Sequence, residues 1–455
     1  MSNIYIHSLL FTVSTLAAMS SYAGAEPWSF IVTGDSRGAD NGVNAAILSE
    51  LADEIIDSGA DFLLFSGDLI NGTQNTGAQL AAWLSIMQPV YDAGIGVYAI
   101  RGNHEDGYFF PDISVWHNTF SGAYALPANG PPGEVNLTYT FVHKNALIAG
   151  LDQYVDLYAV NQPWLDAQLR ANAQPHVFVF GHLAAFQALP RDCLDYYPDR
   201  RDAFWRSLSD AGARMYFASH DHFYDHARID DGDGSPDNDL HQYIVGTAGA
   251  PFYSWQPPYE GNNGAMTPVN IAHAQSYGYV RVDVDGLDVT ATWIARHTND
   301  LGVRGVYLPG ESWSYSVPSL VLLAPNGGER LVAGQDAIIR WERKAYAATQ
   351  NVRLEWYDGT TWRAINTAPV TADAGSYTWN TPGIADSDEC LLRVSDWDNA
   401  GVSDTSNAPF TVFNCRTLLP ADLNGDCYVD MQDLALLAAE WLRCGNPFDP
   451  ACQIE

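Results

Sequence analysis

Short apolar runs alternate with longer stretches of helical periodicity through the first part of this chain of 455 residues. The short runs are rich in β-branched and aromatic residues, which is typical of buried strands, and they lie at 30–33, 61–66, 97–100, 176–180 and 215–217. Between and after them, apolar residues recur every three or four positions at 44–56, 79–91, 164–169 and 203–208. This alternation predicts βαβ units, and therefore an α/β domain over residues 26–297.

The pattern changes towards the C-terminus. Residues 298–318 contain Gly, Ser and Pro without a clear period and are predicted to be a linker. From 319 to 414 the chain shows only short strand patterns, separated by turn signals such as Asp358-Gly359. Regular short strands without helices predict a separate β-sandwich.

The first 25 residues are predicted to be a secretory signal peptide. An apolar stretch over 9–19 precedes Tyr22-Ala23-Gly24-Ala25, a run of small residues typical of a cleavage site. A short membrane anchor is the alternative, although the apolar stretch is too short to span a bilayer. No later segment has the length of a transmembrane helix, so we expect a secreted, periplasmic or cell-surface protein without a transmembrane segment.

The formal net charge of −32 restricts the class of partner. Proteins that bind duplex nucleic acid need a basic surface to displace counterions, so this chain is not expected to bind a nucleic-acid duplex. The same charge slows the approach of anionic substrates, unless bound cations reverse the potential at the site.

Five polar clusters each follow one of the predicted strands. They are Gly34-Asp35-Ser36-Arg37, Gly67-Asp68-Leu69, Gly102-Asn103-His104-Glu105, Gly181-His182 and Ser219-His220-Asp221-His222. Ligands of α/β sheets gather at the carboxyl ends of the strands, so we expect these side chains to converge. Carboxylate, amide oxygen and imidazole donors suit Mn, Fe or Zn better than Ca. Two such metals activate water and neutralise phosphoryl charge, which is what the hydrolysis of a phosphate ester requires.

The ordered clusters resemble those of the calcineurin-like metallophosphoesterase superfamily, which includes purple acid phosphatases. The resemblance covers about residues 30–222 and implies a four-layer α/β/β/α sandwich. It also implies in-line attack of a metal-bridging hydroxide on a phosphate mono- or diester. By position, Asp35 and His222 would bind the first metal, and Asp68 would bridge the two metals. The second metal would be held by Asn103, His182 and His220, and His104 would protonate the leaving oxygen.

Two departures from the family pattern affect the first metal. Arg37 stands where the family has a histidine, and Asn71 stands where purple acid phosphatases have a tyrosine ligand. Either Asn71 supplies an amide oxygen, or water fills the position. Arg37 is expected either to bind a substrate phosphate through its planar guanidinium or to form a structural ion pair.

The last 41 residues carry four cysteines, Cys415, Cys427, Cys444 and Cys452. In an exported protein this density predicts two disulfides, with three pairings open. Oxygen side chains occupy the positions that enclose calcium in an EF-hand loop: Asp422, Asn424, Asp426, Asp430 and Asp433. A helical pattern follows at 434–442, and the whole resembles one repeat of a dockerin module.

The resemblances at the C-terminal end imply partners. A dockerin-like repeat implies a cohesin-like receptor. Alternatively, the tail is a structural or cell-surface sorting segment, or its acidic loop binds no ion. The stretch Ala324-Pro325-Asn326-Gly327-Gly328-Glu329 resembles the start of an Ig-like module appended to exported bacterial enzymes. The predicted chain is thus a metallophosphoesterase domain, an Ig-like β-sandwich and an EF-hand-like calcium tail over residues 415–455.

The substrate class stays open between a small-molecule phosphoester and a phosphorylated glycan or lipid. In two alternative functions, phosphoester hydrolysis is not the main role of the protein. One is a non-catalytic secreted binding or adhesion protein on a degenerate metallophosphoesterase scaffold, and the other is an adhesin for carbohydrate surfaces with an accessory esterase.

Overall fold

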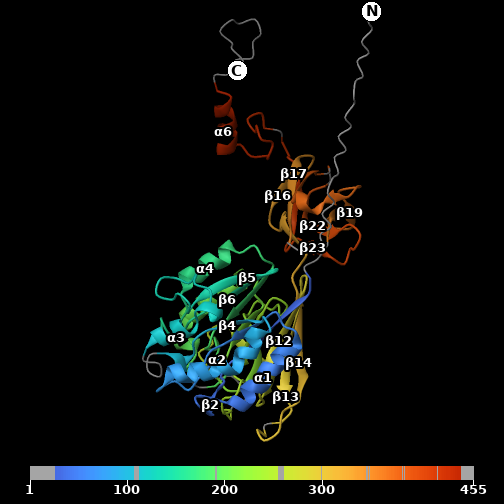
Figure 1. Ribbon diagram of the computed structural model, residues 1–455. Helices are drawn as coiled ribbons and strands as arrows, with labels where there is room; N and C mark the ends of the chain where they lie inside the picture. Colours follow the sequence, from blue (N-terminus) through green and yellow to red (C-terminus); the bar gives the residue numbers. More distant parts are fainter. Residues whose placement is uncertain are drawn as a thin grey trace, which may run out of the picture.

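The computed structural model describes residues 26–441, except 107–111, 190–191, 255–260, 299, 345–346, 348, 382, 384 and 418 (Figure 1). The predicted signal peptide, Cys444 and Cys452 lie outside the described residues. Within them, a mixed α/β domain precedes a β-sandwich and a short tail that ends in one helix. None of the helices in these residues is both long enough and apolar enough to cross a membrane.

The first sheet of the α/β domain has six strands. In spatial order they are β14 (Tyr307–Ser316), β13 (Asp288–Arg296), β12 (Gly278–Asp285), β1 (Trp28–Thr33), β3 (Phe62–Phe65) and β4 (Gly96–Ala99). β1, β3 and β4 are parallel, whereas β12, β13 and β14 pair antiparallel. All residues of β1 and β3 are buried, which explains why these two strands read as continuous apolar runs.

The second sheet has seven strands. Their order is β11 (Thr267–Ala274), β9 (Tyr224–Asp230), β10 (Leu240–Val245), β8 (Met215–Ala218), β7 (His176–Phe180), β6 (Ala146–Gly150) and β5 (Tyr139–His143). β10, β8, β7 and β6 are parallel to one another. The pairings of β9 with β10, β11 with β9 and β5 with β6 are antiparallel. Residues 231–239 connect β9 and β10.

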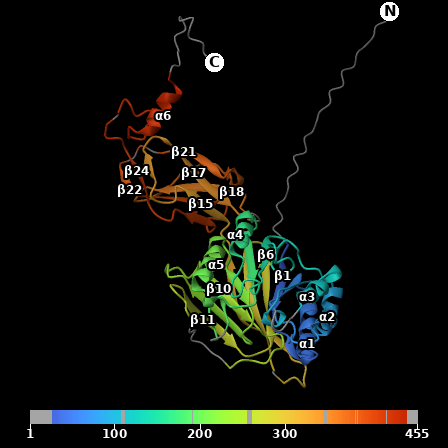
Figure 2. The ribbon, with the colours of Figure 1, turned by 90° about the vertical axis from the view of Figure 1, so that its left-hand side faces the viewer.

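The two sheets pack face to face, and the helices lie outside them (Figure 2). Between the sheets, the ring of Phe30 lies 4.9 Å from that of Phe178 and 6.2 Å from that of Phe217. The helices of the first sheet are α1 (Ala45–Ser58), α2 (Thr76–Asp92) and α3 (Ile113–Thr119), and those of the second are α4 (Gln162–Ala171) and α5 (Pro198–Asp210). The predicted mixed α/β fold is therefore confirmed.

Local sequence signals set the ends of these helices. The side chain of Asn44 accepts a hydrogen bond from the Ile47 N–H at the start of α1, and Gly59 ends that helix with φ of 66°. α5 begins at Pro198, whose missing N–H is not needed in the first helical turn. A short strand, β2 (Arg37–Asp40), and three 3₁₀ turns, η1 (Asn103–Glu105), η2 (Gly122–Tyr124) and η3 (Leu194–Tyr196), lie in the connections.

The predicted linker at 298–318 is wrong over much of its length. Residues 307–316 form β14, which pairs with β13 and belongs to the first sheet. Trp313 and Tyr315 are half-buried against the core, whereas the intervening serines are exposed. The α/β domain thus continues past residue 297.

β14 also connects the first sheet to the second through a polar network. The Tyr224 hydroxyl donates to Glu311 of β14 at 2.6 Å, and Nδ1 of His226 lies 3.1 Å from the same carboxylate. Nε2 of His226 contacts Nδ1 of His241 at 2.7 Å, and the His241 ring stacks on Trp313 at 3.7 Å. The buried imidazoles of His226 and His241 therefore lie on the second sheet and face β14, the edge strand of the first.

This network predicts sensitivity to acid. Burial, the neighbouring His226 and two arginines lower the pKa of His241 to about 2. The unfolded chain binds a proton at this residue below its ordinary pKa of about 6.5, while the folded protein does not. Stability is therefore lost as the pH falls below about 6.5, by about 1.4 kcal/mol per pH unit from this group.

The matched variants are His241→Gln and the exposed His297→Gln, compared with the parent in thermal melts at pH 7 and pH 5. We expect His241→Gln to show a smaller drop in melting temperature between the two pH values than the parent, and His297→Gln to behave as the parent. An equal drop in all three proteins would contradict the assignment.

The β-sandwich has two sheets around one hydrophobic core. The smaller contains β15 (Leu320–Ala324), β17 (Asp336–Arg343) and β21 (Ser376–Asn380). The larger contains β16 (Arg330–Val332), β24 (Phe410–Phe413), β22 (Ser387–Asp396), β18 (Asn351–Tyr357) and β19 (Trp362–Ala364), with β20 (Val370–Thr371) and β23 (Ser403–Thr405) beside it. A 3₁₀ turn, η4 (Ala372–Ala374), precedes β21. Trp356 and Trp379 are buried with ring centroids 5.5 Å apart, so these rings form the core of the sandwich.

The tail contains a disulfide between Cys415 and Cys427 and the helix α6 (Met431–Ala439). This bond is one of the pairs that the four cysteines allow.

Candidate metal centre

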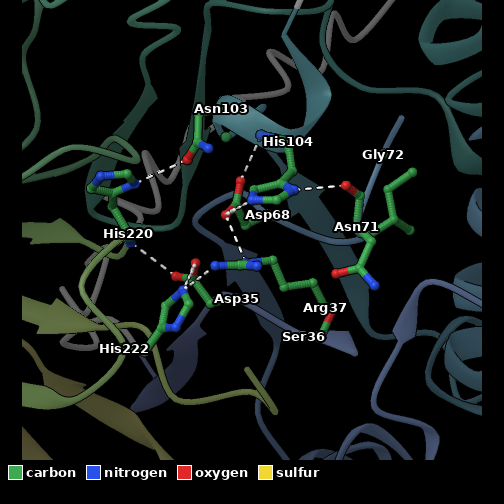
Figure 3. A network of polar contacts seen from close by, with 12 residues as sticks. Asp35, Ser36, Arg37, Asp68, Asn71, Gly72, Asn103, His104, His220 and His222 are labelled. Carbon is green, nitrogen blue, oxygen red and sulfur yellow. Dashed lines mark hydrogen bonds and ion pairs between the residues drawn. The ribbon is translucent and has the colours of Figure 1, made fainter. Parts of the chain in front are cut away.

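The five polar clusters follow β1, β3, β4, β7 and β8, and their side chains meet at one end of the two sheets (Figure 3). Asp35, Asp68 and His220 all have positive φ, at 60°, 52° and 68°. Non-glycine residues adopt this backbone conformation rarely and at an energetic cost, and such residues concentrate at functional sites. A Cβ on Gly102 would lie 2.2 Å from Oδ1 of Asp68, so this position requires glycine.

Four donors converge on one point from both sheets. Nε2 of His182 lies 3.5 Å from Oδ1 of Asp68 and 3.3 Å from Oδ1 of Asn103. Nδ1 of His220 lies 2.9 Å from the Asn103 oxygen and 3.3 Å from Nε2 of His182. Ligands around a tetrahedral zinc ion are separated by about 3.4 Å, given metal–ligand bonds of about 2.0–2.1 Å. The spacings from Asn103 and His182 to their neighbours are therefore those of adjacent ligands around a transition-metal ion.

Hydrogen bonds outside the centre orient two of its imidazoles. The Nδ1–H of His182 donates to the Ser66 carbonyl at 2.7 Å, and that of His222 donates to the Pro251 carbonyl at 2.7 Å. Each bond leaves Nε2 as the nitrogen without a proton, and this atom is directed into the centre. Metal-binding histidines have their second nitrogen fixed in this way.

A second group of possible metal ligands consists of Asp35, Asp68 and His222, whose donor atoms lie within 4.8 Å of one another. Oδ1 of Asp35 and Oδ2 of Asp68 are buried without a hydrogen bond. Oδ1 of Asp35 lies 3.3 Å from Nε2 of His222. Buried carboxylate oxygens that lack hydrogen bonds indicate a place for a cation.

The guanidinium of Arg37 lies at this second group (Figure 3). Its Nε is 3.3 Å from Oδ2 of Asp68, and its Nη2 is 3.0 Å from Nε2 of His222. Nη2 also donates to the Tyr253 hydroxyl at 3.2 Å. The structure therefore brings Arg37 into the centre as a charged group in contact with two of the predicted ligands.

The structure does not bring the side chain of Asn71 among the donors. Its amide nitrogen donates to the Gly38 carbonyl, and Figure 3 shows the amide directed away from Asp68. The backbone carbonyl of Asn71 accepts the Nδ1–H of His104 at 2.7 Å. Asn71 thus positions His104 through its main chain.

His104 lies beside the shared carboxylate. Its backbone N–H donates to Oδ1 of Asp68 at 2.9 Å, and its Nε2 is 3.8 Å from Oδ2 of the same residue. Burial lowers the pKa of His104, and Arg37 adds to this effect, whereas Asp68 opposes it. The Nε2 atom therefore faces the centre.

Charge at the centre depends on Asp68. Burial acts to raise the pKa of this carboxyl, but His182, His104 and Arg37 together outweigh burial and hold the pKa well below its usual range. Asp68 is therefore an anion at every pH at which the protein is expected to work.

Glu105, the last residue of the third polar cluster, has a positioning role that the sequence left open. It is fully buried, and its carboxylate accepts the backbone N–H groups of Asp68, Ile70 and Gly102 at 2.9, 3.1 and 3.0 Å. Burial and the neighbouring Asp68 raise its pKa to about 8. Glu105 is the third residue of η1 and accepts the backbone N–H of its N-cap residue Gly102; a glutamate at this position could have indicated the role in the sequence.

The acidic loop of the tail satisfies its carboxylates internally. Asp422 accepts the N–H groups of Gly425 and Cys427 at 2.7 and 2.8 Å. Asp433 accepts those of Leu423 and Asp430 at 2.6 and 2.8 Å. In the part of the chain that the structure describes, two groups of histidine and carboxylate donors have metal-like spacing. One is Asp35, Asp68 and His222, and the other is Asp230, Asp231 and Asp239 beside the β9–β10 turn. Arg228 pairs with Asp239 there at 2.5 Å.

Comparison with protein families identifies the domain that carries the centre. Residues 29–224 match the family model described as calcineurin-like phosphoesterase, which shows a domain of this type. The match ends before the β-sandwich and the tail, whose Ig-like and dockerin-like character stays a prediction. A search of curated proteins found no match to the chain.

Several solved structures are similar to this chain. The purple acid phosphatase PPD1 from yellow lupin (Lupinus luteus) seeds has a TM-score of 0.51 at 13% identity, over 64% of this chain and 54% of that one. PhoD has a TM-score of 0.45 at 11% identity, over 65% and 71%. A dimetal phosphatase from Danio rerio has a TM-score of 0.42 at 15% identity, over 64% and 99%. This chain therefore spans about half the length of the lupin enzyme, 54%, and shares its fold.

Proposed function

We propose that the chain is a secreted, metal-dependent phosphoesterase that hydrolyses a phosphate mono- or diester, with its calcineurin-like phosphoesterase domain as the catalytic part. The observation that carries the proposal is the convergence of Asp68, Asn103, His182 and His220 on one point beside His104. Mn, Fe or Zn suits these donors. The convergence of a buried anion, an amide oxygen and two oriented imidazoles favours an enzyme over a non-catalytic binding protein.

The residues around the centre divide the work of hydrolysis. Asp68, Asn103, His182 and His220 would hold the metal ion, and the bound ion would supply positive charge that lowers the pKa of water. Arg37 adds a permanent positive charge for the phosphoryl oxygens. When its ring is protonated on both nitrogens, His104 presents the Nε2–H to the leaving oxygen and delivers that proton as the ester bond breaks, returning to the neutral ring whose Nδ1–H is held by the Asn71 carbonyl. Asn71 and Glu105 hold the backbone and ring positions on which this geometry depends.

The test is phosphate release by the purified protein from p-nitrophenyl phosphate and from its bis ester. Activity should be absent after treatment with a chelator and should return with Mn²⁺ or Zn²⁺ but not with Ca²⁺. If the metal-loaded protein turns over neither ester, the non-catalytic binding protein is the better interpretation.

The role of His104 predicts a dependence on the leaving group. His104→Gln should lower kcat by about 10²–10⁴-fold for phenyl phosphate, because removing a general acid costs this much. The loss should be much smaller for p-nitrophenyl phosphate, whose leaving group needs little protonation. The exposed His297→Gln serves as the control and should match the parent on both esters. Equal losses on both esters would contradict the proton-donor role.

The substrate is proposed to be a small-molecule phosphoester or a phosphorylated glycan or lipid, and the net charge disfavours a nucleic-acid duplex. The tail is proposed to bind calcium through Asp422, Asn424, Asp426, Asp430 and Asp433, in the spacing of an EF-hand loop. The calcium-bound tail is proposed to bind a cohesin-like or cell-surface partner. Calorimetric titration of Ca²⁺ into the parent and Asp422→Ala proteins tests it, and heat of binding that is unchanged in the variant would refute it.

A further inference from the structure

We infer that Arg37 takes the place of the first of the two metals, so that this centre holds one transition metal and uses the guanidinium as its second cation. The inference rests on the proposed function, because it concerns the same site. It departs from the dinuclear centre that the sequence resemblance implies.

Arg37 contacts two of the three predicted ligands of the first metal, Asp68 and His222. Its Nε lies 3.3 Å from Oδ2 of Asp68, and its Nη2 lies 3.0 Å from Nε2 of His222. Since Nδ1 of His222 donates to the Pro251 carbonyl, Nε2 is the acceptor of the Arg37 N–H. The electron pair that would bind a metal is therefore used by the guanidinium.

The guanidinium is held in this position from a third direction. Nη2 donates to the Tyr253 hydroxyl at 3.2 Å, and the Tyr253 ring stacks on His222 with centroids 4.0 Å apart. Asp68 is 1% exposed and Arg37 19%, so the ion pair is largely shielded from water. The positive guanidinium repels a divalent ion placed among the same ligands.

Asp68 keeps a bridging role in this arrangement. Its Oδ1 faces the donor group of Asn103, His182 and His220, and lies 3.5 Å from Nε2 of His182. Its Oδ2 faces the guanidinium at 3.3 Å. The carboxylate thus joins one metal position to one arginine, and a phosphoryl group placed between them would meet a positive charge on either side.

The metal content of the full-length protein tests the inference directly. The protein is stripped with a chelator, given excess Ca²⁺ to fill the tail, loaded with Mn²⁺ and freed of unbound ions. Elemental analysis and electron paramagnetic resonance then report how many Mn²⁺ ions each chain holds and whether they are magnetically coupled. The parent should hold one Mn²⁺ with the spectrum of an isolated ion.

Arg37→His restores the imidazole that the family pattern has at this position and removes the competing cation. This variant should hold two Mn²⁺ ions per chain with the spectrum of a coupled pair. Arg200→His is the control, because Arg200 lies on the surface beside Asp156, and this variant should hold one ion.

Two coupled ions in the parent protein would overturn the inference and leave the proposed phosphoesterase function intact. No bound Mn²⁺ in the parent would overturn both. A single isolated ion in Arg37→His, with the variant folded by circular dichroism, would also overturn the inference, because the guanidinium would then not be what excludes the first metal.

Discussion

Replacing Asp68 with alanine is expected to abolish phosphoester hydrolysis and to remove the bound transition metal. The carboxylate faces both donor groups described above, with Oδ1 towards His182 and Oδ2 towards Arg37. Its loss removes a ligand and leaves Arg37 without its main counter-charge. We expect kcat/KM to fall by about 10³-fold or more, since a metal supplies several kcal/mol of transition-state stabilisation.

The measurement is kcat/KM for p-nitrophenyl phosphate, together with metal content per chain. Asp57→Ala removes an exposed carboxylate of α1 and should match the parent in both measurements. Asp68→Asn keeps the shape and one oxygen but loses the charge, and should lie between the parent and Asp68→Ala in metal content. Full activity in Asp68→Ala would refute the centre as described.

Cutting the chain after His297 is expected to prevent stable folding of the α/β domain, whereas a fragment of residues 26–318 should fold. The shorter fragment lacks β14, whose Tyr307, Trp313 and Tyr315 pack against the core. Removing large aromatic side chains from a core costs about 2–3 kcal/mol each, so the total loss is comparable with the whole stability of a domain. Thermal melts and limited proteolysis of the two fragments measure the difference.

Point variants in the full-length chain separate the effect of the strand from that of fragment length. Trp313→Ala should lower the free energy of unfolding by about 2–3 kcal/mol, because the side chain is half-buried against His241. Ser312→Ala changes a neighbouring exposed side chain and should lie within about 0.5 kcal/mol of the parent. Equal melting temperatures for the two fragments would show that β14 adds nothing to the domain.

The central strands and the helices around them were predictable because their signals are local and strong. β1, β3, β7 and β8 are buried on both faces, so their sequences are almost continuously apolar. β14 was missed although Trp313 and Tyr315 alternate with serines in the period of a strand. It is an edge strand, and Pro309 and Gly310 lie beside a register shift against β13, so the usual signals of a loop interrupt the pattern.

At the candidate site, the sequence predicted which residues gather but not how each is used. The order of the clusters follows from the order of parallel strands, and the structure brings Asp35, Asp68, Asn103, His182, His220 and His222 together. Spacing along the chain cannot say where a long side chain points, so the position of the Arg37 guanidinium and the outward direction of the Asn71 amide required coordinates.

The four donors beside His104 are divided between the two sheets. Asp68 and Asn103 follow strands of the first sheet, while His182 and His220 follow strands of the second. An ion bound by all four would therefore cross-link the two sheets, and its binding free energy would add to the stability of the domain. Any displacement of one sheet relative to the other would separate the ligands of this ion. The packing of the two sheets and the catalytic activity would therefore be lost together.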